Sequence, residues 1–412
     1  MRRSKNSTND IGRREFLGEV GTTAAAFIIS KPELVRGSTA NSKISIGLVG
    51  CGGRGTWIAD LFSKHGGYEF VGAADYFQDK VDAYGEKAHI PASKRFTGLS
   101  CHKRLLDSGV DAVVIESPPY FHPAQAAAAV DAGKHVYLAK PVAVDIPGCA
   151  GVAASGKRAT EKKLVFLVDF QTRANAFFVE AVKRVHEGAI GDFAFGEASY
   201  HASVPFPHMY PFLKDPSPSA ENKLRAWGLI RTLSGDIITE QNIHSIDVMS
   251  WIMKVPPLFA VGTGAKTVRK IGDIWDHFVV HFQYPESVGI SFTSRQFEGH
   301  GTQPEGIRNR MFGSKGVLET EYGGNVMIRG ENYFRGGRTS TIYEEGAVNN
   351  IASFYDLVTK RDCGNPTVEP SVQSNRITIL GRKAAYENRI VTWEEILKDA
   401  ERFSPDLAGL KD

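Results

Sequence analysis

The sequence predicts an α/β protein of two domains, the first built on a parallel sheet and the second on a larger, mostly antiparallel open sheet. Three observations lead to this prediction. The chain has 412 residues, a length at which two domains are expected. From Lys43 onward, short apolar strands alternate with helical stretches, which is typical of a parallel sheet covered by helices. After about Asn175, strands follow one another through short turns, which favours antiparallel pairing.

The first predicted domain, residues 41–172, repeats one unit of strand and helix. Each strand is a short apolar run, and most are followed by a stretch of helical periodicity. The predicted strands are 44–50, 68–75, 111–116, 134–139 and 164–169. The predicted helices are 53–64, 78–89, 101–107, 122–132 and 146–160. We expect helices on both faces of this sheet.

The second predicted domain, residues 173–370, is an α+β domain that binds substrate and mediates oligomerisation. Its predicted strands are 193–201, 258–268, 277–284, 288–296, 310–312, 316–321 and 325–329. Its predicted helices are 177–187, 237–253 and 352–360. The Pro- and Ser-rich stretch 205–222 is interpreted as a loop over the site. Residues 371–412, with a helix at 372–388, are expected to pack back on the body.

The first forty residues are interpreted as an export leader. Residues 13–17 read Arg-Arg-Glu-Phe-Leu, and a weakly apolar run follows at 20–29. This pattern resembles the twin-arginine signal of bacteria. We therefore expect the twin-arginine export machinery as a partner and a periplasmic or otherwise exported protein. The alternative is a basic arm on a cytoplasmic enzyme.

Charge and cysteine usage exclude several classes of function. The chain carries 49 Lys and Arg against 46 Asp and Glu, a net charge of +3. The whole excess lies in residues 1–40, so the remaining body is neutral and nucleic acid is not an expected partner. The longest apolar stretch, 24–29, is too short to span a membrane. The four cysteines form no CxxC pair, so no metal site is predicted.

A glycine motif between the first strand and the first helix indicates a dinucleotide site. The motif G-x-G-x-x-G consists of Gly50, Cys51, Gly52, Gly53, Arg54 and Gly55. Asp75 ends the next strand, 20 residues beyond Gly55. Strand, motif, helix and acid in this order are typical of a Rossmann domain, in which the acid binds the adenosine ribose. Because a carboxylate repels a 2′-phosphate, NAD is favoured over NADP. The alternative is a glycine-rich turn without a cofactor.

From residue 43 to about 390, the sequence resembles the Gfo/Idh/MocA oxidoreductase family, which includes glucose–fructose oxidoreductase and inositol dehydrogenases. The resemblance rests on the glycine motif and on three further segments, Pro-Pro-Tyr-Phe-His-Pro at 118–123, Ala-Lys-Pro at 139–141 and Glu-Gln-Asn-Ile-His-Ser-Ile-Asp at 240–247. It implies an NAD(P)-dependent dehydrogenase acting on a sugar or polyol hydroxyl. It also implies a homodimer or homotetramer assembled through the antiparallel sheet.

The resemblance implies three catalytic residues. Lys140 would lie beside the nicotinamide and the substrate hydroxyl. Family members usually carry Glu-Lys-Pro here, whereas this chain has Ala139 before the lysine. His244 is the candidate general acid or base, since its unperturbed pKa lies near neutrality, and Glu240 would orient substrate or His244.

The spacing of Glu240, His244 and Asp247 predicts one helical face. Asp247 either holds the imidazole of His244 or is structural. The three side chains could also form half of a metal site.

Most of the remaining candidates come from the resemblance, whereas Trp227 and Arg231 are chosen because they precede the catalytic helix and could stack on or bind a sugar. Ser117, Pro118, His122 and Gln171, together with Lys140, would contact the cofactor. Candidate substrate contacts besides the catalytic residues are Arg173, Tyr200, His201, Trp227 and Arg231.

Three functions stay open at this point. The first is a plain dehydrogenase. The second follows from the leader, because little NAD is available outside the cytoplasm. An exported enzyme would hold NAD tightly and regenerate it in place, either by coupling two sugars or as a glycosidase or lyase that forms a transient keto sugar. That glycosidase needs a second base, for which His201, Tyr200 and Glu240 are candidates. The third function is a non-catalytic sugar-binding protein that contains NAD.

Overall fold

The first domain contains a six-stranded sheet in which every pair of neighbouring strands is parallel. The computed structural model describes residues 43–302 and 305–412, so the predicted leader lies outside the described residues. The strands are β1 (Ile44–Val49), β2 (Tyr68–Ala74), β3 (Arg95–Phe96), β4 (Ala112–Ile115), β5 (His135–Ala139) and β6 (Phe166–Asp169). Their order is β3-β2-β1-β4-β5-β6. The order reverses between β1 and β4, and ligands bind at the carboxyl ends of the strands at such a point.

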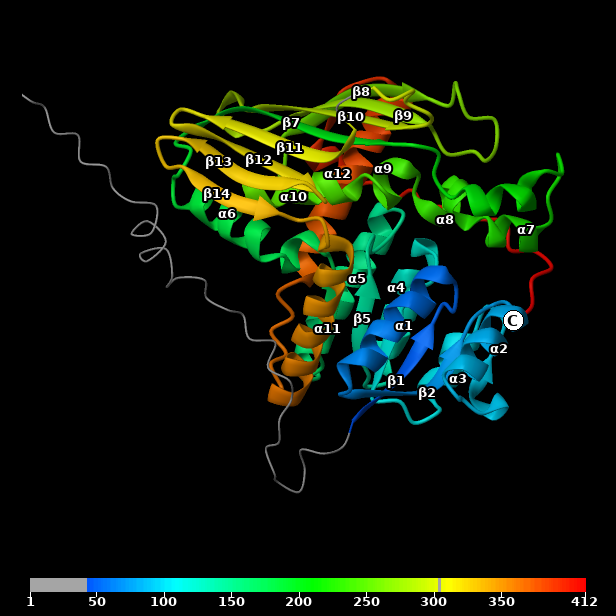
Figure 1. Cartoon of the computed structure of the whole chain (residues 1–412). Helices are drawn as coiled ribbons and strands as arrows, with labels where there is room; N and C mark the ends of the chain where they lie inside the picture. Colours follow the sequence, from blue (N-terminus) through cyan, green and yellow to red (C-terminus); the bar gives the residue numbers. More distant parts are fainter. Residues whose placement is uncertain (1–42, 303–304) are drawn as a thin grey trace, which may run out of the picture. The chain divides into compact units, whose positions relative to one another are not determined.

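Helices cover this sheet as predicted (Figure 1). They are α1 (Gly53–His65), α2 (Gln78–Lys87), α3 (Cys101–Leu106), α4 (His122–Asp131) and α5 (Ile146–Glu161). A later helix, α11 (Ile342–Lys360), packs on α1. Its Phe354 is fully buried and meets the rings of Phe62 and Tyr137. Although α11 was predicted as part of the second domain, it completes the core of the first.

The second domain contains a nine-stranded sheet, of which only the pair β7–β10 is parallel. The strands are β7 (Phe193–Ala202), β8 (Phe259–Ala265), β9 (His277–Gln283), β10 (Gly289–Gln296), β11 (Gly306–Gly313), β12 (Gly316–Tyr322), β13 (Asn325–Gly330), β14 (Phe334–Arg338) and β15 (Val391–Thr392). Their order is β14-β13-β12-β11-β7-β10-β9-β8-β15. The predicted fold class is therefore confirmed.

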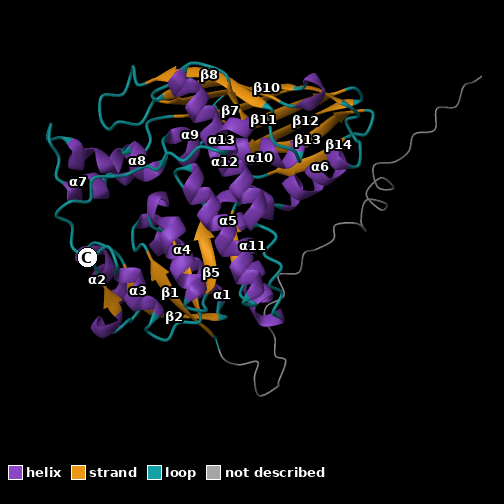
Figure 2. Cartoon of the chain, turned by 180° about the vertical axis from the view of Figure 1, so that it is seen from behind, coloured by secondary structure: helices purple, strands orange, loops and turns teal. Residues whose placement is uncertain are grey.

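Helices line the inner face of the nine-stranded sheet, between it and the parallel sheet (Figure 2). The remaining helices are α6 (Ala176–His186), α7 (Ala220–Arg225), α8 (Arg231–Ser234), α9 (Ile237–Glu240), α10 (Ile243–Met253), α12 (Val368–Glu387) and α13 (Trp393–Leu397). Short 3-10 turns occupy Ala92–Lys94, Pro119–Phe121, Thr172–Ala174, Pro207–Leu213, Trp227–Leu229 and Pro285–Ser287. The predicted helix 237–253 is divided at Gln241 and Asn242 into α9 and α10. The single helical face expected for residues 240–247 is therefore interrupted.

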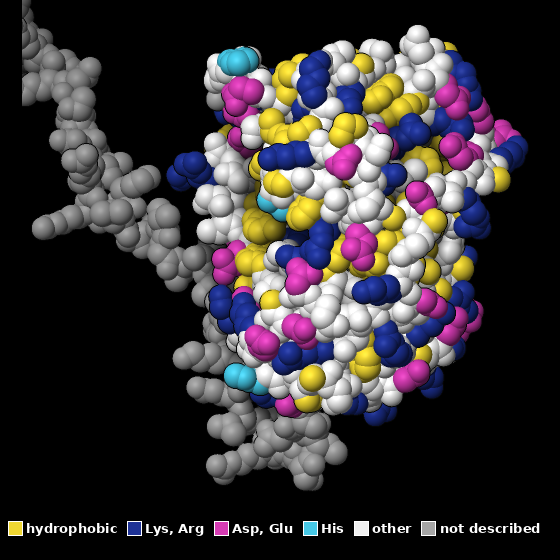
Figure 3. Space-filling model, turned by 90° about the vertical axis from the view of Figure 1, so that its right-hand side faces the viewer, with side chains coloured by type: hydrophobic (Ala, Val, Ile, Leu, Met, Phe, Trp, Pro, Cys, Tyr) yellow, Lys and Arg dark blue, Asp and Glu magenta, His cyan; other side chains and the backbone are white. Residues whose placement is uncertain are grey.

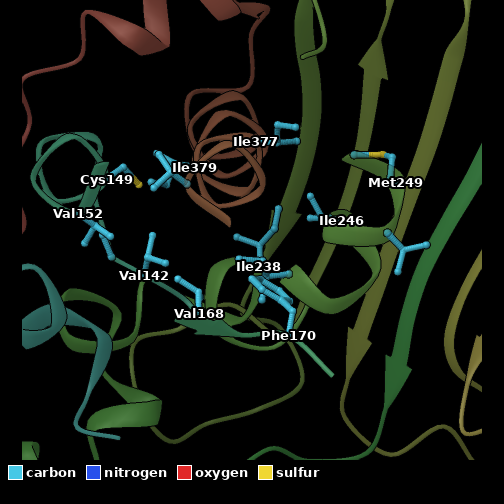
Figure 4. Close-up of a cluster of buried hydrophobic side chains, with 14 of the residues drawn as sticks. Val142, Cys149, Val152, Val168, Phe170, Ile238, Ile246, Met249, Ile377 and Ile379 are labelled. Atoms are coloured by element: carbon cyan, nitrogen blue, oxygen red, sulfur yellow. The ribbon is translucent and has the colours of Figure 1, made fainter. Parts of the chain in front are cut away.

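A continuous hydrophobic core joins the two domains (Figure 4). Helix α12 lies at its centre and contacts α5 and β6 of the first domain as well as α10 and β8 of the second. Ile377 and Ile379 of α12 are almost fully buried in this cluster. Residues 371–412 were predicted to pack back on the body, and α12 does so between the sheets.

The described surface carries charges of both signs. Figure 3 shows Lys and Arg side chains interspersed with Asp and Glu on the visible face. In residues 43–302 and 305–412, no helix is long and apolar enough to cross a membrane. Nor do these residues contain a group of three or more His, Cys, Asp or Glu side chains arranged to hold a metal ion.

Candidate active site

The glycine motif forms the turn between β1 and α1, and Gly50 and Gly55 are required there for steric reasons. Gly50 has φ 93°, a conformation that side-chain-bearing residues rarely adopt. A Cβ on Gly55 would lie 1.9 Å from the carbonyl oxygen of Gly50, so only glycine lets α1 approach the strand. Gly52 and Gly53 have open space where a Cβ would be. The start of α1 therefore presents backbone N–H groups to that space, as a phosphate site requires.

Asp75 is fixed against this turn. Its Oδ2 accepts a hydrogen bond from the backbone N–H of Cys51 at 2.7 Å, and its Oδ1 accepts one from that of Phe77 at 2.9 Å. Burial raises the pKa of Asp75, while both backbone hydrogen bonds oppose the rise. Cys51 thus contributes a backbone contact to the acid rather than a side chain to the ligand space.

The first cavity, which we call the dinucleotide pocket, extends from the glycine turn over the carboxyl ends of β1 and β2. The predicted cofactor residues on its wall are Gly50, Gly52, Gly53, Asp75, Ser117 and Pro118. The second domain supplies the opposite wall, with His208, Met209, Phe212, Leu224, Arg225 and Trp227. The predicted loop 205–222 therefore does lie over the site, as a 3-10 turn and the start of α7.

The second cavity, which we call the reaction chamber, shares Glu116, Ser117 and Trp227 with the dinucleotide pocket. It brings together most of the predicted catalytic and substrate residues. Those on its wall are Arg54, Lys140, Gln171, Tyr200, Trp227, Glu240 and His244. The two cavities meet at the carboxyl end of β4, next to the point where the strand order reverses.

Lys140 and Glu240 form a buried ion pair on the chamber wall. The lysine Nζ lies 3.1 Å from Oε1 of Glu240 and donates to the backbone oxygen of Glu240 at 2.6 Å. Their side chains are 11% and 8% exposed. The second carboxylate oxygen, Oε2, has no hydrogen-bond partner among the described residues. A substrate hydroxyl would find a free acceptor there, directly beside the lysine.

His244 lies in the chamber in its neutral form. Burial lowers its pKa well below the usual value, and the positive charges of Lys140 and Arg54 add to this effect. Its Nδ1 has no hydrogen-bond partner within the described part of the chain. A neutral imidazole with an unused nitrogen can accept a proton. The lowered pKa makes His244 a weaker base than the near-neutral histidine expected from the sequence.

Arg54 forms the wall of the chamber on the side of the first domain. Its guanidinium donates to Oδ2 of Asp169 at 2.7 Å and lies 3.4 Å from Oε2 of Glu116. Burial lowers the pKa of Arg54, but Glu116 and Asp169 outweigh it and the net shift is upward. Asn350 of α11 donates to the other oxygen of Asp169 at 2.7 Å, so α11 fixes this cluster as well.

Besides Cys51 and Gly55 of the glycine motif, four predicted site residues do not line either cavity. Arg173 binds Asp247 through Nε and Nη2, at 2.9–3.1 Å. His201 follows Tyr200 on β7, and successive strand residues face opposite sides of a sheet. It therefore lies on the outer face, where its Nε2 is 3.1 Å from the hydroxyl of Thr293.

The other two are Arg231 and His122. Arg231 lies over the ring of Tyr386, 4.8 Å from its centre. His122 is 1% exposed. Its Nδ1 is 2.8 Å from the carbonyl oxygen of Pro141, and its Nε2 is 2.7 Å from that of Ser117. His122 therefore ties the Lys140 loop to the end of β4 instead of facing the cavity.

Asp247 takes the structural role that was one of its two predicted alternatives. It is fully buried, and its Oδ1 accepts hydrogen bonds from Arg173 and from the hydroxyl of Ser374. No hydrogen bond joins it to His244 among the described contacts. The break between α9 and α10 explains this, because Glu240 and Asp247 no longer follow one regular helix.

Sequence reasoning missed several residues of the chamber. They are Glu116, Pro119, Phe206, Gln241, Ile307, Tyr322 and Tyr343. Glu116 had a usable signal, since an acid at the carboxyl end of a central parallel strand lies where ligands bind. Tyr322 and Tyr343 come from β12 and the start of α11, and no local pattern marks them.

The residues present fit a dinucleotide. The open glycines, the N-terminus of α1 and the anchored Asp75 suit the adenosine and phosphate groups. Glu116, Ser117 and Trp227 lie where the two cavities join. The nicotinamide end would lie in the reaction chamber, near Lys140.

Comparisons with known families agree with this geometry. Residues 44–170 match the GFO/IDH/MocA profile described as an oxidoreductase family with an NAD-binding Rossmann fold. Residues 178–319 match the profile of the GFO/IDH/MocA C-terminal domain. Together the two profiles cover the parallel sheet, strands β7 to β11 and the start of β12 in the nine-stranded sheet, and all three catalytic candidates.

Individual relatives are distant. A myo-inositol 2-dehydrogenase of Thermotoga maritima is 24% identical over 85% of this chain and 99% of its own length. A glycosyl hydrolase family 109 protein of Solibacter usitatus is 27% identical over 48% of this chain and 46% of its own length. The crystal structure of an aldose–aldose oxidoreductase from Caulobacter crescentus has the same fold, with a TM-score of 0.66, 19% identity, and coverage of 85% of this chain and 99% of its own.

Proposed function

The chain belongs to the GFO/IDH/MocA oxidoreductase family, and from this premise we propose that it oxidises a hydroxyl group of a sugar or polyol with a tightly held NAD. The observation that carries this proposal is the convergence of Lys140, Glu240 and His244 in one chamber that opens into the dinucleotide pocket. The match to a myo-inositol 2-dehydrogenase along almost its whole length supports a polyol or sugar as substrate.

The side chains divide the work as follows. NAD, when bound, supplies the hydride acceptor. Neutral His244 accepts the hydroxyl proton at its free nitrogen, and Lys140 holds the developing oxyanion with its ammonium group. Glu240 keeps Lys140 in place through Oε1 and offers Oε2 to a neighbouring hydroxyl. Tyr200 donates to Gln241 at 2.7 Å, and this bond supports the chamber wall.

NAD is favoured over NADP by the charges around Asp75. Lys80 and Arg225 also line the dinucleotide pocket and could attract a 2′-phosphate. Both lie beside Asp79, at 3.9 Å and 2.8 Å. Asp79 offsets part of this positive charge. Asp75 faces the ribose position, so a 2′-phosphate would meet its carboxylate and gain little attraction from the two cations.

Tight retention is supported by contacts that bridge the dinucleotide pocket from the second domain. Arg225 of α7 pairs with Asp79 and lies 3.8 Å above the ring of Phe77. The hydroxyl of Tyr76 donates to Glu221 at 3.0 Å. These contacts hold residues 207–225 across the cofactor site.

The C-terminal segment adds a second connection. Figure 1 shows it passing α7 and ending beside α2 and α3. The backbone N–H of Lys411 donates to the hydroxyl of Tyr76 at 3.2 Å, and that of Leu99 donates to the carbonyl of Lys411 at 2.9 Å. Leu99 itself lines the dinucleotide pocket. We call residues 207–225 and 403–412 together the clamp.

The predicted export leader also favours tight binding of NAD. Folded export through the twin-arginine route would carry NAD out with the protein, and the clamp would prevent its loss. The enzyme would then restore NAD within the same site by reducing a second sugar. A homodimer or homotetramer formed through the nine-stranded sheet is part of the same proposal, by analogy with the family.

A redox-neutral glycosidase is the second candidate, favoured by the glycosyl hydrolase family 109 relatives. Of its three candidate second bases, His201 lies on the outer sheet face and Tyr200 already donates to Gln241. Burial also raises the pKa of Tyr200. Glu240, with its free oxygen, is the remaining base. The relatives match less than half of their own length, so the dehydrogenase is the better-supported function.

One experiment separates these possibilities. The full chain is purified and denatured, and the released nucleotide is identified. We expect about one equivalent of NAD. The native protein is then incubated with sugars, polyols and aryl glycosides. Oxidation of one sugar coupled to reduction of another, without NADH accumulation, supports the proposed cycle. Steady NADH formation with added NAD indicates a plain dehydrogenase that exchanges its cofactor, whereas aglycone release without NADH indicates the glycosidase. Recovery of nucleotide-free protein would contradict tight retention, and no turnover of any member of the panel would contradict both activities.

A further inference from the structure

Glu116 occupies a position that the proposed chemistry leaves unused. It follows β4 directly, and it lines both the dinucleotide pocket and the reaction chamber. Its side chain is only 1% exposed. A ligand that extends from the first cavity into the second must pass this carboxylate.

The two oxygens of this carboxylate are in different environments. Oε2 lies 3.4 Å from Nε of Arg54, whereas Oε1 has no hydrogen-bond partner among the described residues. Leaving a buried carboxylate oxygen without a donor is costly. Burial raises the pKa of Glu116 to about 7, with Arg54 and Lys140 opposing the rise. The local structure therefore provides a partner for one oxygen of the carboxylate and leaves the other, Oε1, buried without a donor among the described residues.

The sheet register explains why this carboxylate has room. Ile115 of β4 is paired with Leu138 of β5, so Glu116 is level with Ala139. Both residues line the chamber, and the methyl group of Ala139 leaves the space beside Glu116 open. A longer residue at 139 would compete for that space. The residue that directly follows β5 is the catalytic candidate Lys140.

We propose that Oε1 of Glu116 is a cofactor-binding acceptor at the junction of the two cavities, which receives a hydrogen bond from a ribose hydroxyl or the carboxamide N–H of the nicotinamide half of the dinucleotide. The adenosine half would lie near Asp75 and would gain nothing from this contact. Glu116 therefore affects how the reactive end of the cofactor is held, and Arg54 fixes the carboxylate from behind.

The test compares ligands that contain or lack the nicotinamide half. Binding of NAD, ADP-ribose and AMP to the nucleotide-free full chain is measured by calorimetry for the wild type, Glu116→Gln and Glu116→Asp. In Glu116→Gln, the amide oxygen faces Arg54 and the amide NH₂ replaces the acceptor. In Glu116→Asp, the charge is kept but the shorter side chain falls short of the ligand. We expect each variant to lose about tenfold in NAD affinity and less than about twofold in AMP affinity.

ADP-ribose identifies the donor. An equal loss for ADP-ribose and NAD assigns the ribose hydroxyl, and a loss for NAD alone assigns the carboxamide. Asp169→Asn is the matched control, because it disturbs the same guanidinium without adding or removing a pocket group, and its ratio of NAD to AMP affinity should match the wild type. Equal losses of NAD and AMP affinity in the Glu116 variants, or no loss of either, would overturn the proposal. The readout is binding, so it does not depend on which sugar is the substrate.

Discussion

Nζ of Lys140 lies 3.1 Å from Oε1 of Glu240, and these two residues come from different domains. Lys140 directly follows β5 of the parallel sheet, whereas Glu240 ends α9 beneath the nine-stranded sheet. The reaction chamber is therefore assembled only when the domains are packed together. The core around α12 fixes that packing.

Replacing Lys140 by Met should abolish turnover while NAD stays bound. The change keeps the length of the side chain and removes the charge that would hold the substrate oxyanion, so we expect a loss of about 10³-fold in kcat. Lys134→Met is the control and should behave as the wild type, because Lys134 directly precedes β5, at the end of the strand away from the reaction chamber. Steady-state rates and nucleotide content are the measurements. Substantial activity in Lys140→Met would refute the assignment.

His244 should act as a base in its neutral form, and its titration should show this. Burial and the charges of Lys140 and Arg54 lower its pKa, so protonation of His244 should not reduce kcat/KM until the pH is well below 6.5. Loss of the lysine charge in Lys140→Met should raise the pKa of His244, as measured by NMR on its ring protons. An unchanged pKa in that variant would show that the two side chains are not electrostatically coupled.

The first domain could be predicted from sequence almost element by element, because each part has a local cause. Gly50, Gly55 and Asp75 belong to a motif whose spacing follows from the turn itself. Of the four candidates outside the cavities, His122 belongs to the first domain, and Arg173, His201 and Arg231 belong to the second. His201 was predicted to face the substrate, but it lies on the opposite side of the sheet from Tyr200, because successive residues of β7 point to opposite faces. The interruption at Gln241 and Asn242 follows from long-range packing, which leaves no pattern in a helical-looking sequence.

The residues of the reaction chamber likewise fall into those that a sequence pattern marks and those that only the tertiary structure brings there. Lys140 and His244 were found because the family pattern marks them, while Tyr322 and Tyr343 arrive from elements far along the chain. Glu116 had a local signal, an acid at the carboxyl end of a central parallel strand. An acid in that position is also typical of an apolar strand that simply ends at a polar residue. Helix α11 was assigned to the wrong domain because its periodicity gives a buried face without saying which sheet that face covers.

Asp75→Ser should weaken discrimination against NADP. The substitution removes the negative charge facing the 2′ position and keeps a short hydrogen-bonding group near the N–H of Cys51. The ratio of NADP to NAD affinity should rise about tenfold, which corresponds to about 1.4 kcal/mol. Asp82→Ser, on the outer part of α2, is the control for a lost acid. If the ratio is the same in both variants, Asp75 does not select the cofactor.

Acidification should destabilise the protein through His122. Burial lowers the pKa of His122 from 6.5 to about 4, so the unfolded chain binds a proton more readily than the folded one between these values. Stability is therefore lost as the pH falls through this window, by about 3 kcal/mol once it is below 4. Glu116 and Asp236, whose pKa values are raised by burial to about 7 and about 6, contribute in the opposite direction.

The variant His122→Gln separates the contribution of His122 to the pH dependence of stability from those of Glu116 and Asp236. His122→Gln keeps a donor for the carbonyls of Ser117 and Pro141 but does not titrate. Urea unfolding at pH 7 and pH 4.5 should show a smaller acid-dependent loss in His122→Gln than in the wild type. An equal loss in both would assign the acid sensitivity to other groups.

Loosening the clamp should release NAD faster without changing the chemical step. Arg225→Ala removes the pair with Asp79 and the contact with Phe77, which together are worth about 1 kcal/mol at a partly exposed site. The dissociation rate of NAD should rise about fivefold, as followed by the loss of bound nucleotide after dilution.

Lys87→Ala is the control. It removes the 2.6 Å ion pair with Asp60 inside the first domain and should leave the dissociation rate of NAD unchanged, because this pair does not bridge the pocket. Since Lys140, Glu240 and His244 are untouched in Arg225→Ala, single-turnover oxidation at saturating NAD should proceed at the wild-type rate. A slower chemical step with unchanged release would mean that residues 207–225 shape the chamber instead of retaining the cofactor.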